Sequence, residues 1–299
     1  MKSYLKLTLK ITISALLLTY LLLYNDLSKV LNILLQVNPV YFVLASLLII
    51  INYVFSAVRW KYLVLDSKIS IFYMIKLYFI GSFFNNFLPT SIGGDAYKIV
   101  KLGEKIGSKT NSFTATFLER FIGMIALLVI SLYGYLTFSS FNIYNFLLVF
   151  TLIIASFFGF LLFYPKFTFK PKILLKLFVI LDKVHDSFMR YKREPLLIGY
   201  SFLASIVVQM SAIFTQYFIF KSLDVTLPID FSLFAFPVIF LSGYAIPSVN
   251  GIGSQEILYT SFFTSIGVLA SICIAASFLY HISRLVVSFI GGLLYLNEK

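Results

Sequence analysis

Long apolar runs, separated by short polar stretches, divide the chain from end to end. A helix that crosses a lipid bilayer needs about 20 consecutive apolar residues. Six runs are long enough to supply such a helix, namely residues 8–24, 40–58, 115–138, 144–164, 196–220 and 268–296. The pattern therefore predicts an all-α, polytopic integral membrane protein with about six full spans. It also predicts a single transmembrane domain over residues 1–299.

Two further apolar stretches, 69–88 and 231–246, run directly into sequence that is rich in Pro and Gly. Proline lacks a backbone N–H and stops a helix, and glycine allows backbone conformations that other residues avoid. Backbone freed from helical hydrogen bonds is stable at membrane depth only where protein or a water-filled cavity surrounds it. Each stretch is therefore predicted to form a broken, re-entrant helix.

Basic residues gather in three segments, 59–68, 98–109 and above all 165–194. The loops between other pairs of spans carry only Lys29 and Lys221. Segments rich in Lys and Arg stay on the cytoplasmic side of a membrane. We therefore expect a multi-pass protein of the cell membrane with its N- and C-termini and all three basic segments in the cytoplasm.

The same orientation makes the two broken stretches hairpins that enter the membrane from opposite faces. Segments 59–68 and 98–109 lie on one side, so the run between them must enter and return on that side. Residues 231–266 must do the same from the other side. Opposed entry with matched Pro and Gly breaks is typical of transporters built from inverted repeats.

The expected half-repeats cover about residues 40–164 and 196–296 and are joined by the basic segment 165–194. In that segment, apolar residues recur at helical spacing with lysines between them. This pattern is typical of an amphipathic helix that lies on the cytoplasmic leaflet. A solvated linker is the alternative.

The two breaks share a sequence pattern that carries the candidate site. In each, Pro is followed by a hydroxyl residue, by Gly four positions after the Pro, and then by an acidic residue at the expected start of a helix. Bare N–H groups at such helix starts attract anions, and neighbouring amide side chains bind polar ligands. One such pattern alone is compatible with an ordinary turn, whereas two copies in opposed topology favour a binding function. The candidates are Asn85, Asn86, Pro89, Gly93, Gly94 and Asp95 in the first break, and Pro247, Asn250, Gly251, Gly253 and Glu256 in the second.

Two arginines in the spans that follow the breaks are candidate ligands for an anion. Arg284 lies about 18 Å from the end of its predicted helix, and a charge at that depth is costly unless it is paired. His281 lies one turn earlier on the same face. Arg284 is therefore expected either to pair with a backbone carbonyl or Glu256, or to hold an anionic headgroup. Arg120 either lines a polar cavity inside the bundle or reaches the cytoplasmic interface of the membrane. Its neighbour Glu119 points about 100° away from it.

Other polar residues near the breaks have simpler explanations. Asp95 is suited to cap a helix over 96–104, whose lysines, Lys98 among them, fit a membrane surface. Arg59 and Trp60 are expected to anchor the end of a span at the lipid interface.

The composition excludes several classes of function. The chain is 60% hydrophobic and 12% charged, which is typical of a membrane protein, and its net charge of +12 comes mainly from the basic segments. Two histidines and one cysteine do not make a metal site. No Gly-x-x-x-x-Gly-Lys-Ser/Thr stretch that would bind ATP occurs. We therefore expect no metal, no cofactor and no nucleic acid as ligand.

Segment 85–95 with Glu119 and Arg120, and segment 247–256 with Arg284, resemble the flippase-like transmembrane region of the lysylphosphatidylglycerol synthase family. The elements Phe-Leu-Pro…Gly-Gly-Asp and Pro-Ser-x-x-Gly-x-Gly-x-x-Glu carry the resemblance, which extends along nearly the whole chain. It implies movement of aminoacylated phosphatidylglycerol or related lipids between leaflets, and some stand-alone relatives are linked to polyprenyl-phosphate sugar pathways. These 299 residues hold no counterpart of the soluble aminoacyl-transferase domain of the synthases, so synthesis of lysyl-lipid is not expected.

Residues and resemblance together favour a flippase-like translocator over an enzyme. Its ligands would be lipids with anionic headgroups: an anionic phospholipid, an aminoacylated phospholipid or a polyprenyl-phosphate-linked lipid. One alternative is a membrane-embedded lipid-linked glycosyl- or phosphoryl-transferase with Glu119, Asp95 or Glu256 as its base. Another is a non-catalytic membrane subunit for a soluble partner enzyme at the cytoplasmic face. A homo-oligomer is compatible with each of these functions.

Overall fold

The computed structural model describes residues 27–65, 68–87, 93–138, 188–245 and 251–298, together with residues 179, 182, 185 and 186. Over these residues the regular structure is helical, without a strand. The helices are α2 (Leu27–Leu35), α3 (Pro39–Leu63), α4 (Ile71–Phe87), α5 (Gly93–Lys105), α6 (Lys109–Phe138), α9 (Pro195–Ser222), α10 (Ile229–Ala245), α11 (Ser254–Phe263), the short 3₁₀ helix η3 (Thr264–Ile266) and α12 (Ala270–Leu296). The expected spans 8–24 and 144–164, and most of segment 165–194, lie outside the described residues.

Within the described part of the chain, four helices are long and apolar enough to cross a membrane. They are α3, α6, α9 and α12, with 25, 30, 28 and 27 residues. These helices coincide with four of the six runs predicted from the hydrophobic pattern. Both α3 and α9 begin with a proline, at the position where the missing N–H has no helical partner. The all-helical membrane architecture expected from the sequence is thus confirmed.

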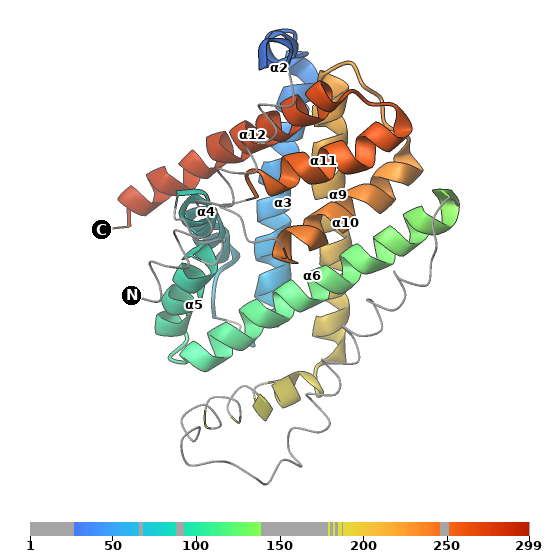
Figure 1. Cartoon of the computed structure of the whole chain (residues 1–299). Helices are drawn as coiled ribbons and strands as arrows, with labels where there is room; N and C mark the ends of the chain where they lie inside the picture. The colour runs from blue at the N-terminus through green and yellow to red at the C-terminus, as the bar shows by residue number, and fades with distance from the viewer. Residues whose placement is uncertain are drawn as a thin grey trace.

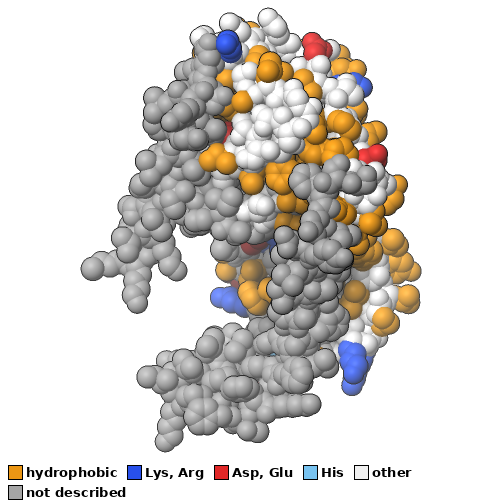
Figure 2. Space-filling view, turned by 45° about the vertical axis from the view of Figure 1, so that its right-hand side comes forward, with side chains coloured by type: hydrophobic (Ala, Val, Ile, Leu, Met, Phe, Trp, Pro, Cys, Tyr) orange, Lys and Arg blue, Asp and Glu red, His pale blue; other side chains and the backbone are white. Residues whose placement is uncertain are grey.

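The outer surface of the long helices is apolar. On α3 the side chains of Val40, Val43, Leu44, Leu47 and Ile51 are all exposed and recur every three or four residues, so they form one stripe. Hydrophobic side chains likewise spread along the visible face of the described helices in the space-filling view (Figure 2). Contiguous apolar surface of this extent is unfavourable in water and is matched by lipid chains. The protein is therefore embedded in a membrane.

Helices α3 and α9 form an antiparallel pair at the centre of the described fold (Figure 1). The backbone N–H of Asn38 donates to the carbonyl of Ser222 at 2.8 Å, which joins the start of α3 to the end of α9. Near the middle of the pair, the side-chain amide of Asn52 donates to the Val208 carbonyl at 2.7 Å and to the Ser211 hydroxyl at 3.1 Å. Such polar contacts hold helices together in lipid, where apolar surface provides little driving force.

The two stretches that were predicted to break form the short helices α4 and α10. Each has 17 residues, about 26 Å at 1.5 Å per residue, which is less than the roughly 30 Å hydrocarbon core of a bilayer. Each ends within one residue of the boundary expected from the apolar pattern, and a second short helix follows it, α5 or α11. The breaks themselves, 88–92 and 246–250, lie outside the described residues.

Each short helix packs on a long helix from the other half of the chain. Helix α4 lies against α12, and α10 lies against α6. In Figure 1, α4 and α5 lie to the left of the central pair and α10 and α11 overlap it, while α6 and α12 run across the picture in opposite directions. The two halves of the chain are therefore interleaved.

Glycines allow the close approach at both of these crossings. A Cβ on Gly291 of α12 would lie 1.9 Å from the carbonyl oxygen of Phe79 in α4. A Cβ on Gly134 of α6 would lie 2.6 Å from the backbone nitrogen of Phe234 in α10. Small residues let helix backbones meet in a membrane, where van der Waals contact stabilises the pair.

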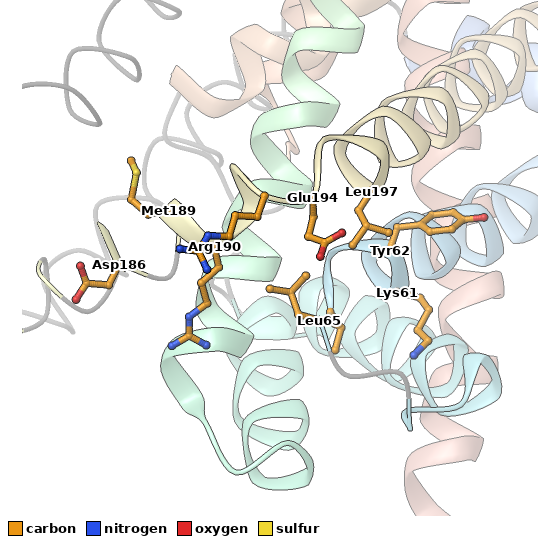
Figure 3. A pocket seen from close by; sticks show the side chains of 10 residues that line it. Lys61, Tyr62, Leu65, Asp186, Met189, Arg190, Glu194 and Leu197 are labelled. Atoms are coloured by element: carbon orange, nitrogen blue, oxygen red, sulfur yellow. The ribbon is translucent and has the colours of Figure 1, made fainter.

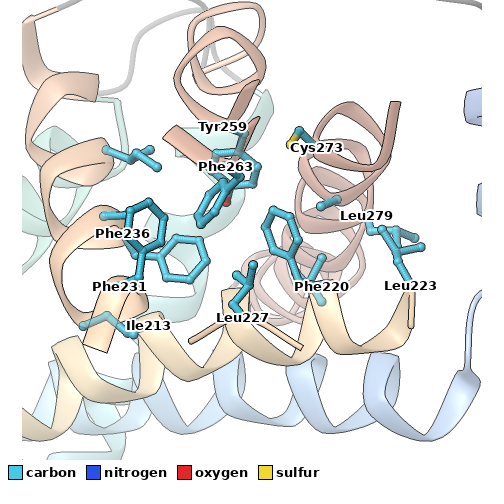
Figure 4. Packing of buried hydrophobic residues seen from close by; sticks show 14 of the residues in the cluster. Ile213, Phe220, Leu223, Leu227, Phe231, Phe236, Tyr259, Phe263, Cys273 and Leu279 are labelled. Atoms are coloured by element: carbon cyan, nitrogen blue, oxygen red, sulfur yellow. The ribbon is translucent and has the colours of Figure 1, made fainter. Parts of the chain in front are cut away.

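A dense aromatic cluster fills the space between α9, α10, α11 and α12 (Figure 4). The ring of Phe263 lies at its centre, with ring centroids 4.7 Å from Phe220, 5.1 Å from Phe236 and 5.7 Å from Phe231. A second apolar cluster, around the fully buried Trp60, forms mainly between α3, α4, α5 and α6. Most of the apolar core thus belongs to one half of the chain or the other.

We predict that Gly291→Ala lowers the stability of the protein by about 1–3 kcal/mol or more, because the added methyl group overlaps the backbone of α4. The measurement is thermal unfolding in detergent micelles, followed by circular dichroism. Gly199→Ala is the matched control, since that position in α9 has open space around it and alanine favours a helix. Equal unfolding temperatures for the two variants would contradict the close α4–α12 contact.

Candidate functional site

Six polar side chains from four helices meet inside the first half of the chain. We call this group the first polar cluster. Its members are Arg59 of α3, Tyr78 of α4, Asp95 and Lys98 of α5, and Glu119 and Arg120 of α6. Its three cations and two carboxylates leave one positive charge in excess.

Glu119 is the centre of the first polar cluster and is fully buried. Its carboxylate accepts hydrogen bonds from the Arg59 guanidinium and, at 2.5 Å, from the Tyr78 hydroxyl. The ammonium of Lys98 lies 3.7 Å from its other oxygen. A buried carboxylate is stable only when it is paired and hydrogen-bonded. Glu119 therefore joins α3, α4, α5 and α6 through its charge.

Lys98 and Arg120 share the carboxylate of Asp95. The Lys98 ammonium lies 2.9 Å from Asp95 Oδ1, and two nitrogens of Arg120 donate to the same carboxylate at 2.8 and 3.1 Å. Lys98 is buried and also lies 4.0 Å from the centroid of the Tyr78 ring, within the range of a cation–π contact. The Arg120 side chain is 40% exposed, so it is the cation of this cluster that a ligand could reach.

The start of α5 is held against α4 by a backbone contact that only glycine allows. A Cβ on Gly94 would lie 1.9 Å from the carbonyl oxygen of Gly81. The side-chain oxygen of Asn85 accepts the N–H of Gly94 at 2.8 Å, which satisfies one of the bare donors at the helix start. Asn85, rather than Asp95, thus provides this cap, because α5 begins at Gly93 and places Asp95 inside its first turn.

A second polar cluster lies between α11 and α12. Glu256, which is fully buried in the first turn of α11, accepts the Gly253 N–H at 2.7 Å and the Ser277 hydroxyl at 3.1 Å. The imidazole Nε2 of His281 lies 3.3 Å from Glu256 Oε1. Gly251 and Gly253 have φ of +87° and +85°, which L side chains rarely adopt. Glycine at these two positions therefore lets the chain turn tightly into α11.

The second polar cluster continues toward the central helix α9. Tyr259 is fully buried, donates its hydroxyl proton to Gln216 of α9 and accepts a hydrogen bond from Gln255 at 2.8 Å. These side chains link α11 to α9 through neutral groups. In the first half, the link from Arg59 of α3 to Glu119 of α6 is ionic.

Arg284 joins α12 to the end of α4. One of its nitrogens donates to Asn86 Oδ1 at 3.1 Å, and the Asn86 amide donates to the Arg284 carbonyl at 3.2 Å. The guanidinium carbon also lies 5.4 Å from the centroid of the Tyr280 ring. Glu256 pairs with His281, so the sequence-based alternative of an Arg284–Glu256 pair is not what the structure has.

The two clusters repeat one arrangement. In each half, the acidic residue in the first turn of the second short helix binds a basic side chain that comes 25 residues later, on the long helix that follows. The pairs are Asp95 with Arg120 and Glu256 with His281. By their positions after the two breaks in the sequence, Arg120 and Arg284 were expected to be equivalent. In the structure, the contacts of Arg120 correspond to those of His281.

Besides the Asp95 cap, two sequence-based interpretations were wrong. Arg59 and Trp60 are 3% and 0% exposed, so they do not anchor α3 at a lipid interface. Lys98 is 2% exposed and does not lie on a membrane surface. In each case the interpretation used the nearest residues in the sequence, whereas the partner of Arg59 lies 60 residues away. Of the candidates from the breaks, Pro89, Pro247 and Asn250 lie outside the described residues.

A surface pocket of about 770 Å³ lies where α3 ends and α9 begins (Figure 3). Lys61, Arg190 and Arg193 bring positive charge to its lining, beside Asp186 and Glu194. None of its lining residues belongs to the two polar clusters. Near it, the hydroxyl of Tyr191 donates to the Leu63 carbonyl at 2.5 Å, and burial raises the pKa of that phenol above its usual value. Tyr191 thus ties the segment before α9 to the end of α3.

The described residues contain no group of three or more His, Cys, Asp or Glu side chains that could hold a metal ion. The polar groups of both clusters instead form salt bridges and hydrogen bonds between helices. Long apolar helices, two pairs of short helices and buried charge beside each pair define the class of this protein as a polytopic helical membrane protein with polar clusters inside its bundle.

Within that class, the chain belongs to the lysylphosphatidylglycerol synthase TM region family, whose model matches residues 7–292. It is 22% identical to a UPF0104 membrane protein of Pyrococcus horikoshii, over 100% of this chain and 98% of that protein. It is 29% identical to a UPF0104 membrane protein of Methanocaldococcus jannaschii, over 48% of this chain and 45% of that one. No solved structure matches the chain. The family resemblance found in the sequence is confirmed.

We predict that Glu119→Gln destabilises the protein by about 3–5 kcal/mol, because Arg59 and Lys98 are then left buried without a countercharge. Unfolding midpoints in mixed micelles of mild detergent and sodium dodecyl sulfate provide the measurement. Glu104→Gln, on an exposed position of α5, makes the same chemical change and should leave the midpoint in place. A small effect at Glu119 would show that the cluster is held by packing rather than by charge.

Proposed function

We propose that this protein translocates lipids with anionic headgroups between the two leaflets of the cell membrane. The headgroup would pass along the polar clusters inside the bundle, and the acyl or prenyl chains would stay in the surrounding lipid. Anionic phospholipids, aminoacylated phospholipids and polyprenyl-phosphate-linked lipids all have the required chemistry. The repeated pairing of an acid in a half-helix with a basic side chain 25 residues later is the observation that carries this proposal.

An inverted repeat is the first part of the argument. The order of a long helix, two short helices and a long helix occurs twice, as α3 to α6 and as α9 to α12. The packing of α4 on α12 and of α10 on α6 supports a two-fold relation between the halves. The matching antiparallel contact of α3 with α9 supports an axis that passes between them. Transporters of this type bind their substrates near the midplane, where the broken helices meet.

Charge at the two breaks is the second part of the argument. A charged side chain inside a membrane is costly and is usually retained for a substrate or ion pathway. Arg120 is 40% exposed at the first break, and Arg284 connects α12 to the end of α4 beside that break. An anionic headgroup would bind these guanidinium groups through charge-assisted hydrogen bonds, aided by the backbone N–H groups at the starts of α5 and α11.

The orientation of the protein in the membrane is the third part of the argument. Lys61, Arg190 and Arg193 surround the pocket at the end of the bundle where α3 finishes. We expect this end, and with it both termini, on the cytoplasmic side. Anionic lipids concentrate in the cytoplasmic leaflet and are attracted to basic surfaces there. The pocket would therefore gather lipid headgroups before they enter the bundle.

Leaflet exchange of fluorescent lipids in liposomes tests the proposal. Purified protein should speed the exchange of lipids with anionic headgroups, measured by chemical quenching of the outer leaflet. We predict that Arg284→Ala lowers the rate at least about tenfold, because removing one charged hydrogen-bond donor to the headgroup costs about 1.5–3 kcal/mol. Lys192→Ala is the matched control, since it removes an exposed cation outside both clusters.

The outcome is informative only if the variant stays folded, which the unfolding temperature in detergent establishes. Equal exchange by wild-type protein and a folded Arg284→Ala variant would remove Arg284 from the proposed path. No exchange of any anionic or prenyl-linked lipid by wild-type protein would overturn the proposed function itself.

A further inference from the structure

The two acid–base pairs at the breaks differ in one chemical respect. Asp95 pairs with Arg120, and a guanidinium stays charged at every physiological pH. Glu256 pairs at the equivalent position with His281, and an imidazole gains and loses its proton near neutral pH. Only the second pair can therefore change its charge during a transport cycle.

The geometry assigns the proton positions in this pair. His281 Nε2 lies 3.3 Å from Glu256 Oε1 and 3.5 Å from the Ser277 hydroxyl, which itself donates to Glu256 Oε1. A carboxylate only accepts hydrogen bonds, so we place the hydrogen of the neutral imidazole on Nε2. The remaining lone pair is then on Nδ1. That atom is buried and has no hydrogen-bond partner among the residues that the structure describes. A buried imidazole nitrogen without a partner is the atom at which a further proton would add.

We propose that the Glu256–His281 pair binds the proton that drives lipid translocation by this protein. The proposal rests on the proposed function and identifies its coupling ion. One proton adds to Nδ1, which converts the neutral imidazole into an imidazolium and leaves the Glu256 carboxylate ionised. Release of the same proton on the other side of the membrane returns the pair to its starting state.

Burial of the pair supports alternating access to the proton. His281 is 9% exposed, Glu256 is fully buried, and Nδ1 has no contact with solvent. A proton therefore reaches Nδ1 only when α11 and α12 move apart. A coupling ion must be enclosed in this way, because a site open to both sides at once would dissipate the gradient.

The groups near the pair come from several helices. The Ser277 hydroxyl of α12 contacts both partners. Further out, α12 has Tyr280 and Arg284, α11 has Tyr259, α9 has the Gln216 amide, α4 has the Asn86 amide, α3 has Tyr53, and α10 has the ring of Phe236. Lys29 of α2, the further helix that packs on α12, is exposed. These neighbours contribute one permanent charge next to the pair, that of Arg284.

The Glu256–His281 pair lies next to the turn that leads into α11, so a change in its charge acts on that turn. A Cβ on Gly251 would lie 4.0 Å from His281 Cε1, so the turn into α11 rests beside the imidazole. Protonation strengthens the attraction between α11 and α12 by making both partners charged. Loss of the proton weakens it, and the left-handed glycines Gly251 and Gly253 are positions where the backbone can adjust.

Nuclear magnetic resonance tests the proton site without any transport assay. The sequence has two histidines, so His185→Gln leaves His281 as the single signal in protein that carries ¹³C-labelled histidine and a histidine-free purification tag. We expect the chemical shift of this signal to change with pH, because one proton adds to Nδ1 in the proposed cycle. In Glu256→Gln the midpoint of this change should shift, because the imidazolium loses its countercharge.

Glu298→Gln is the matched control for this titration. It makes the same chemical change on a residue whose partner is Tyr97, and it should leave the midpoint of His281 in place. A His281 signal that does not titrate, or that has the same midpoint with Gln at position 256, overturns the proton site. Whether the His281 signal titrates is decided with Glu256 in place, so this test stands even if Glu256→Gln does not fold.

Liposomes with an imposed pH gradient separate this inference from the proposed function. Wild-type protein should accumulate anionic lipid in one leaflet when the gradient is present, and His281→Gln should exchange lipid without accumulation. Exchange by wild-type protein that ignores the gradient overturns the proton as coupling ion and leaves translocation standing. Accumulation by His281→Gln equal to that of wild type places the coupling proton elsewhere.

Discussion

A backbone group without a hydrogen-bond partner cannot face hydrocarbon, and the rest of this structure depends on that constraint. Helices α4 and α10 have 17 residues each, near the lower limit for a helix that spans a bilayer, and a second short helix follows each of them. Backbone groups at their ends that lack a helical partner need protein or water around them. Helices α12 and α6 pack along α4 and α10, and the glycines at 291 and 134 allow the backbones to meet. Polar side chains also meet inside the described bundle, where donors and acceptors are sheltered from lipid.

The two halves of the chain bury polar side chains with different chemistry. In the first half, permanent charges on Arg59, Lys98 and Glu119 connect three helices with almost no exposure. In the second half, neutral groups on Gln216 and Tyr259 join α9 to α11, and the second polar cluster holds one carboxylate and one imidazole. Buried ion pairs fix a geometry because separating them is costly, whereas neutral hydrogen bonds separate more easily. The first half thus has the contacts between helices that cost more to separate.

Much of the fold could be predicted from the sequence. The length of an apolar run determines whether a helix can span lipid, so α3, α6, α9 and α12 were found within a few residues. Proline and glycine act locally, so the ends of α4 and α10 were also found. The site was predicted less well. Its residues at the breaks were identified by pattern, but their partners are set by packing between distant helices, such as the 60 residues between Arg59 and Glu119.

The interleaving of the halves also has a consequence for how the chain reaches this state. Helix α4 is synthesised well before α12, yet the two helices pack together. A protein normally folds from its N-terminus as it is synthesised. The contacts of α4 with α3 and α5 can form while the second half of the chain is still being made, whereas its contact with α12 at Gly291 has to wait for that half. The interleaving of the halves thus makes the α4–α12 contact a late step of assembly.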